Sequence, residues 1–178
     1  MAHSPVYILG GSQTDFSRNW NREGSDIYGL FEASLNDALA STQIDAEDIE
    51  VAHVGNFVSA LFTGQALLNG FFGHVHPALH NIPTSRHEAA CASGSMALLA
   101  AMRDIEAGHY GLACVLGIEL MRNVDGKTGA DHLGAAAWRG IETQGCTYPW
   151  PHMFASIYDI YQQRYGTDIN YLRAIAKN

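Results

Sequence analysis

A cysteine stands at the point where an extended segment ends and a helix is expected to begin. Cys91 lies in the run Glu-Ala-Ala-Cys-Ala-Ser-Gly-Ser-Met-Ala at residues 88–97. A proline bounds the short segment before it, and residues 95–107 contain neither proline nor glycine, which favours a helix. A thiol at the start of a helix lies next to unpaired backbone N–H groups and the positive end of the helix dipole, and both favour the thiolate. Because the thiolate is the nucleophilic form, this arrangement predicts covalent catalysis by Cys91.

The helix dipole alone does not make Cys91 an efficient nucleophile at neutral pH. A free cysteine has a pKa of about 8.5. The dipole contributes about 0.3–1 kcal/mol, less than the ~1.36 kcal/mol that corresponds to one pKa unit. A histidine from elsewhere is therefore required. His87 precedes Cys91 by an even number of residues, which in a strand places both on one side, and it is a second candidate for the base. The alternative for Cys91 is a buried structural thiol.

The remaining cysteines and a cluster of histidines are weaker candidates for a catalytic or metal-binding site. Cys114 lies in an apolar run and is expected in the core, whereas Cys146 lies in a polar stretch and is expected to be exposed or to line a pocket. His74, His76 and His80 have a spacing that could bind zinc. No aspartate lies near them, so we expect loop or interface histidines and no metal site.

Composition and charge narrow the class of protein. The chain has 178 residues, 47% of them hydrophobic, which suffices for one full domain and is short for two. Its formal net charge is -8, and its ten Lys and Arg residues form no dense run, which argues against nucleic acid as a partner. An odd number of cysteines points to a reducing compartment, and we expect a cytoplasmic protein. No secretory signal and no apolar stretch of about 20 residues is present, so no membrane span is expected.

Strand and helix patterns alternate along the chain. Strands are expected at residues 6–11, 50–58, 84–90 and 112–118, a short helical turn at 45–48, and helices at 25–40, 63–72, 95–107, 153–165 and 170–176. This order predicts an α/β domain with a mostly parallel, mixed sheet covered on both faces. Residues 96–102 carry no polar side chain, which predicts a buried central helix after Cys91. Residues 1–122 are assigned to this domain, and residues 123–178 to a glycine-rich excursion followed by helices.

Several of these segments resemble the N-terminal half of a thiolase, closest to the branch that includes the sterol-carrier-protein-type thiolases. The matching segments are residues 54–57, 88–94, 106–108, 116–121, 154–155, 165–167 and 175–178. The resemblance extends over nearly the whole chain, and the Cys-Ala-Ser-Gly segment is its most specific part. It implies a layered α-β-α half-domain in which Cys91 is the nucleophile.

The resemblance also implies an activity in lipid metabolism. In the family, the cysteine takes an acyl group from an acyl-coenzyme A as a thioester, and a second, deprotonated acyl-CoA attacks it to form a carbon–carbon bond. The reverse reaction cleaves a 3-ketoacyl-CoA. The coenzyme A thioester is thus a substrate, and no bound cofactor is expected. A homodimer is implied, with the strand before Cys91 near its twofold axis.

The sequence departs from the family where the other catalytic groups are expected. Family chains are about twice as long, and their second half carries a histidine in a Gly-His-Pro motif, an oxyanion-site Asn or His, and a second cysteine in a Cys-x-Gly context. Here the nearest string is His76-Pro77 after Val75, before the nucleophile. The C-terminal half is therefore expected to be missing, and a hetero-oligomer with such a half is the alternative to a homodimer.

Two other functions are kept open. The first is a non-catalytic thiolase-like subunit or fragment that acts by association, including a partner in an aldolase-type complex. The second is a ketoacyl-synthase-like condensing enzyme that uses a carrier-protein thioester. The phosphates of coenzyme A require cations, for which Arg122, Lys127 and Arg139 are the candidates. Asn56 is expected at a strand end, either near the site or in a structural turn.

Overall fold

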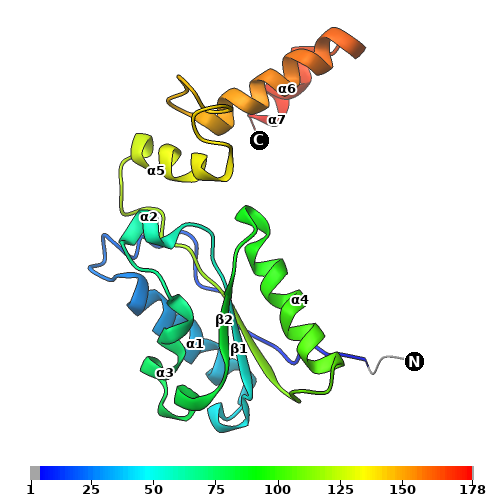
Figure 1. Cartoon of the computed structure of the whole chain (residues 1–178). Helices are drawn as coiled ribbons and strands as arrows, with labels where there is room; N and C mark the ends of the chain where they lie inside the picture. Colours follow the sequence, from blue (N-terminus) through cyan, green and yellow to red (C-terminus); the bar gives the residue numbers. More distant parts are fainter. Residues whose placement is uncertain (1–4, 178) are drawn as a thin grey trace. The chain divides into compact units, whose positions relative to one another are not determined.

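The chain folds into two compact units. The computed structural model describes residues 5–177, and its contacts separate Met1–Asp125 from Gly126–Asn178. Figure 1 shows the sheet and its helices in the first unit and a helical second unit. Each unit is described by itself below.

Three parallel strands form the sheet of the first unit. They are β1 (Val51–Gly55), β2 (Thr84–His87) and β3 (Ala113–Gly117), arranged in the order β2-β1-β3. All five residues of the central strand β1 are buried. In the register, Gly55 lies opposite His87 on one side and Gly117 on the other, so the carboxyl ends of the strands coincide. The predicted α/β class with a parallel sheet is confirmed.

Helices cover both faces of the sheet. The helix α4 (Ser93–Glu106) packs on one face, and α1 (Ile27–Thr42) and α3 (Phe71–Val75) lie on the other (Figure 1). The main core lies on the α1 side, and its most completely buried large side chains are Phe31, Phe72, Leu35, Leu68, Leu79 and Val54. The layers therefore follow the predicted α-β-α order.

Caps fix one end of each of three helices in the first unit. Asp26 caps α1, because its Oδ1 accepts a hydrogen bond from Gly29 N at 2.9 Å. The short 3-10 helix η1 (Ala46–Asp48) is capped by Asp45 in the same way. At the end of α4, Gly108 adopts a φ of 74°, the left-handed conformation that glycine tolerates best.

The helix expected at residues 63–72 is wrong. The segment is broken into α2 (Ser59–Thr63), η2 (Leu68–Gly70) and α3, followed by η3 (Pro77–Asn81). Gly64 at a φ of 73° ends α2, and Leu67 at a φ of 52° breaks the chain again. Local turn chemistry thus outweighs the helical spacing of the apolar residues.

The strand expected at residues 6–11 is also wrong. This segment forms no strand, and Tyr7, Ile8 and Leu9 are 66–80% exposed. An apolar run becomes a buried strand only when neighbouring backbone groups pair with it and other side chains cover it. Within the described residues, β3 pairs with β1 alone.

The helix α4 has one buried face rather than burial on all sides. Its buried residues are Ser93, Ala97 and Ala101, which follow one another at intervals of four and so share a face. Met96 and Leu98 on other faces are 36% and 47% exposed. The small side chains let the helix lie close to the sheet, and residues 5–177 provide one sheet for it to pack on.

The second unit is helical. It contains α5 (Gly126–Leu133), η5 (Gly134–Ala136), α6 (Pro149–Tyr165) and α7 (Ile169–Ile175). The excursion expected at residues 123–151 therefore holds a helix of its own. Trp150 Nε1 donates to Leu133 O at 2.9 Å and ties α6 to α5. Across residues 5–177, none of the helices has both the length and the apolar character needed to cross a membrane.

The closest approach between α4 and the sheet yields a test. A Cβ added to Gly55 would lie 2.6 Å from Gly94 Cα and 2.7 Å from Ser93 O, both backbone atoms that cannot turn away. We expect Gly55→Ala to lower the free energy of unfolding by about 1–3 kcal/mol, because the helix must shift outward. Urea denaturation measures this change.

Gly117→Ala is the matched control, because Gly117 is the register partner of Gly55 and an added Cβ there meets no atom within 4 Å. Its effect should stay within about 0.5 kcal/mol. Equal effects of the two substitutions would show that the helix does not rest on Gly55.

Candidate active site

Cys91 lies in a short turn between the edge strand and the sheet-covering helix. The 3-10 turn η4 (Ala90–Ala92) follows β2 after two residues and leads directly into α4. Cys91 is exposed. The structure therefore places the thiol at the strand–helix junction that the sequence indicates, and the alternative of a buried structural thiol does not hold.

Hydrogen bonds from flanking side chains shape this turn. Ser93 is 4% exposed, and its Oγ accepts from Ala89 N at 2.9 Å and donates to Ala90 O at 2.7 Å. Glu88 Oε1 accepts from Ala90 N at 2.6 Å. The buried hydroxyl of Ser93 thus joins the two residues before Cys91 to the start of α4. Ser93 lies within the motif around Cys91, but its residue type and spacing alone do not indicate this role.

The residue before Cys91 has an uncommon backbone conformation. Ala90 has a φ of 49°, in the left-handed region that residues with a Cβ rarely adopt. Such strain persists only where surrounding contacts hold it, and it concentrates at functional turns. The hydrogen bonds of Ser93 and Glu88 at this residue supply those contacts.

Two motif segments meet at the carboxyl edge of the sheet. Ile118 N donates to Gly55 O at 3.0 Å, and Asn56 Nδ2 donates to Ile118 O at 2.8 Å. Phe57 N donates to Glu119 Oε2 at 2.8 Å. Open α/β sheets bind ligands at this edge. Asn56 is 1% exposed and serves the structural turn, one of the two roles expected for it.

A buried carboxyl and a guanidinium lie beside this junction. Burial raises the pKa of Glu119, against the opposing effect of the Phe57 N–H bond. Arg86 Nη2 donates to Phe57 O at 2.7 Å and holds the same loop from β2. Sequence reasoning missed both roles. Glu119 lies in the segment 116–121, one of the segments that resemble thiolases, and this position was the signal in the sequence that could have identified it.

Histidines engage partners other than Cys91. Within residues 5–177, no hydrogen bond joins Cys91 to a histidine, and the Nε2 of His87 contacts Ser85 Oγ and His53 Nδ1 instead. His76 Nδ1 accepts from Ala78 N at 3.3 Å, and the ring of His74 packs edge-on against Tyr28. Among the residues that the structure describes, no three His, Cys, Asp or Glu side chains converge as metal ligands. The zinc alternative thus gains no support.

The three basic residues proposed to bind the phosphates of coenzyme A are divided between the two units. Arg122 belongs to the first unit and donates from Nη1 to Arg18 O at 3.2 Å and Ser17 O at 3.4 Å. Lys127 and Arg139 belong to the second, where Arg139 pairs with Asp131 at 2.9 Å. Their role in binding coenzyme A remains a prediction.

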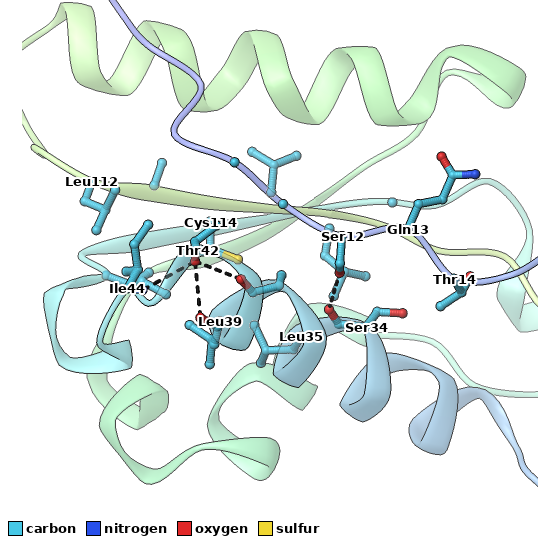
Figure 2. Close-up of a pocket in the computed structure, with 18 of the residues that line it drawn as sticks. Ser12, Gln13, Thr14, Ser34, Leu35, Leu39, Thr42, Ile44, Leu112 and Cys114 are labelled. Atoms are coloured by element: carbon cyan, nitrogen blue, oxygen red, sulfur yellow. Dashed lines mark hydrogen bonds between the residues drawn. The ribbon is translucent and has the colours of Figure 1, made fainter.

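A cavity of about 270 Å³ lies elsewhere in the first unit, between the N-terminal segment, α1 and β3. Figure 2 shows Ser12 bonded to Ser34 at one end and Thr42, Leu112 and Cys114 gathered at the other. Burial raises the pKa of Cys114 to about 11, so its thiol is inert at neutral pH. None of the lining residues belongs to the Cys91 turn, and this cavity is not the candidate site.

Comparison with known proteins places these features in a family. The profile described as "Thiolase, N-terminal domain" matches residues 6–163. Acetyl-CoA acetyltransferases of Methanocaldococcus jannaschii and Methanothermobacter thermautotrophicus are 32% and 31% identical over 94% and 91% of this chain. The benzoylsuccinyl-CoA thiolase subunit BbsB of Thauera aromatica is 33% identical over 64% of it.

The match covers a smaller share of each relative than of this chain. The chain spans 41% and 40% of the two acetyltransferases and 28% of the thiolase subunit. The match includes the sheet, the Cys91 turn and most of α6. This chain belongs to the thiolase family and corresponds to its N-terminal domain.

Proposed function

We propose that this chain carries the acyl-accepting cysteine of a thiolase and that Cys91 takes an acyl group from an acyl-coenzyme A. One observation carries the proposal: in a chain of this family, the thiol is exposed on a turn held by Ser93 and Glu88 at the start of α4. The names of the curated relatives make acetyl-CoA the first substrate to test.

The acyl transfer follows from the chemistry of the thiol. The Cys91 thiolate attacks the thioester carbonyl, a carbon–sulfur bond forms, and the carbonyl oxygen gains negative charge. We assign the stabilisation of this oxyanion to backbone N–H groups of the turn η4 and the start of α4, among them that of Cys91. The bond to the coenzyme A sulfur then breaks, and coenzyme A leaves and takes up a proton. The acyl group passes from Cys91 to the carbanion of a second acyl-CoA, or in the reverse direction to coenzyme A.

The base for this reaction is proposed to come from outside the described residues 5–177. The ring of His87 hydrogen-bonds with Ser85 and His53, and its backbone oxygen accepts from Asn56 N. Within residues 5–177, no histidine forms a hydrogen bond with Cys91. The relatives are more than twice as long as the matched region. We assign the base and the second proton-transfer group to a segment equivalent to the unmatched part of those relatives, in the same or another polypeptide.

Association without catalysis is the alternative, and a specific feature favours it. Met96 and Leu98 on α4 are exposed, and one relative is named as a thiolase subunit. Large apolar side chains exposed on more than one side of a helix are typical of a segment that other protein surfaces cover. Retention of an exposed Cys91 favours the catalytic function over this one.

Transfer of an acetyl group to Cys91 is the direct test of the catalytic proposal. The protein, assembled with the segment equivalent to the remainder of its relatives, is incubated with acetyl-CoA and digested for peptide mass analysis. We expect acetylation of the peptide that contains Cys91, loss of the label in Cys91→Ala, and full labelling in the control Cys146→Ala. Unlabelled Cys91 in the assembled protein would leave association as the function.

The relative reactivity of the three thiols follows from their surroundings. With a limiting pulse of iodoacetamide at about pH 8, Cys91 should react first and Cys114 last, because Cys114 is buried and its pKa is raised to about 11. In urea all three should react alike. Earlier alkylation of Cys146 than of Cys91 would contradict the assignment of the reactive thiol.

The Ser93 hydroxyl should control the shape of the turn. Ser93→Ala removes two hydrogen bonds and leaves Ala89 N and Ala90 O without this partner, so we expect a loss of about 1–3 kcal/mol in unfolding free energy. The Cys91 alkylation rate should change with it. Ser95→Ala, an exposed serine two positions along α4, is the control and should change neither quantity.

A further inference from the structure

A chain of polar side chains lies on the α4 side of the sheet, apart from the Cys91 turn. His53 on β1 is 4% exposed, and its Nδ1 lies 2.9 Å from Ser85 Oγ and 3.0 Å from His87 Nε2, both on β2. Ser85 Oγ and His87 Nε2 are 2.8 Å apart. The other ring nitrogen of His53 lies 3.2 Å from Asp104 Oδ2 on α4. This cluster of His53, Ser85, His87 and Asp104 joins the edge strand to the central strand and the helix.

The number of protons that this cluster can hold is limited. His53 Nδ1, Ser85 Oγ and His87 Nε2 form a triangle with sides of 2.8–3.0 Å. One arrangement satisfies the neutral cluster: His87 donates from Nε2 to Ser85, Ser85 donates its hydroxyl proton to His53 Nδ1, and the His53 Nε2 proton faces Asp104. The Nε2–Asp104 contact is within ion-pair distance although it lacks hydrogen-bond geometry. One neutral tautomer of each histidine is thereby selected.

A first added proton can be accommodated, and a second cannot. A proton on either ring leaves one facing nitrogen as an acceptor, and the Asp104 carboxylate compensates a charge on His53. When both rings are protonated, two N–H groups with like charges face each other at the 3.0 Å separation of their nitrogens. Like charges at this distance in a half-buried place repel strongly. The cluster must then open.

Among the described residues, Asp104 is the carboxylate that acts on His53. A solvent-open cavity of about 330 Å³ adjoins it, and its polar lining comprises His53, Thr84, Ser85, Asp104, His109 and Tyr110. The charges that act on His53 are those of Asp104, which raises its pKa, and of His87, which lowers it, while burial is the largest effect and lowers it overall. Because the unfolded imidazole binds its proton at higher pH than the folded one, stability falls as the pH drops below about 6.5.

The strand that the cluster holds is the one that leads to Cys91. Within the described residues, β2 pairs with β1 alone, and Ser85 is the register partner of His53. We propose that the His53–Ser85–His87–Asp104 cluster is a proton-operated clasp, which fixes β2 and the turn after it while at most one histidine is charged and releases them when both are. This inference does not depend on acyl transfer, and its test needs none.

Amide hydrogen exchange of the peptide that contains β2 tests the proposal. Protection factors, corrected for intrinsic exchange rates, are measured between about pH 8 and about pH 5, with the α1 peptide as an internal reference. Opening takes up two protons where the closed cluster is neutral and one where it already holds a proton, so the loss of protection should lie between about tenfold and about a hundredfold per pH unit. The α1 peptide should keep its protection. Equal losses in both peptides, or none in the β2 peptide, would overturn the proposal.

Two variants distinguish the clasp from a general effect of acid. His87→Gln keeps a donor near the position of Nε2 but cannot take a proton, so the pH dependence of the β2 peptide should become shallower. His109→Gln, on a histidine of the same cavity outside the triangle, should behave like the wild type. Histidine NMR titration gives a check that needs no variant. Independent titration of His53 and His87, each in the ordinary range, would contradict the clasp.

Discussion

The contact between the start of α4 and the end of β1 sets the geometry of the rest of the first unit. Backbone atoms of Ser93 and Gly94 lie so close to Gly55 that no Cβ fits between them. This approach fixes where α4 begins, and the helix start in turn fixes the turn that carries Cys91. The buried face of α4 continues with Ala97 and Ala101, so the same close packing extends along the sheet. The exposed thiol therefore stands on a backbone segment that close packing and hydrogen bonds hold in place.

The site is assembled from loops that follow neighbouring strands, and local sequence could reveal only part of it. Apolar runs predicted β1 and β3, and the lack of proline and glycine predicted most of α4, because those signals act over a few residues. The strands expected at 50–58 and 84–90 are shorter than predicted and end at Gly55 and His87. The contacts of Glu119 with Phe57 and of Arg86 with the same loop join residues more than 25 positions apart. No spacing rule encodes such contacts, although the resemblance to thiolases identified the segments in which several of these residues lie.

The errors in prediction have physical reasons of the same kind. The spacing of apolar residues at 63–72 fits a helix, but Gly64 and Leu67 take left-handed conformations and divide the segment. The run at residues 6–11 has strand composition, yet strand formation depends on a neighbour that local composition does not supply. For α4, composition indicated burial on all sides. The structure covers one face, because burial depends on what is available to cover a helix as well as on its side chains.

The helix α4 is attached to the sheet near both ends, and this links the two polar regions of the unit. Its start rests on Gly55, and Asp104 near its end faces His53, two residues earlier on the same strand. Ten residues of helix separate Gly94 from Asp104, or roughly 15 Å. Both ends of α4 thus rest on β1, the start against Gly55 and the end through the contact of Asp104 with His53. Strand β2 provides a second connection, because His87 is both a member of the cluster and the last residue of the strand before the turn. The His53 cluster and the Cys91 turn therefore share one helix and one strand as their structural support.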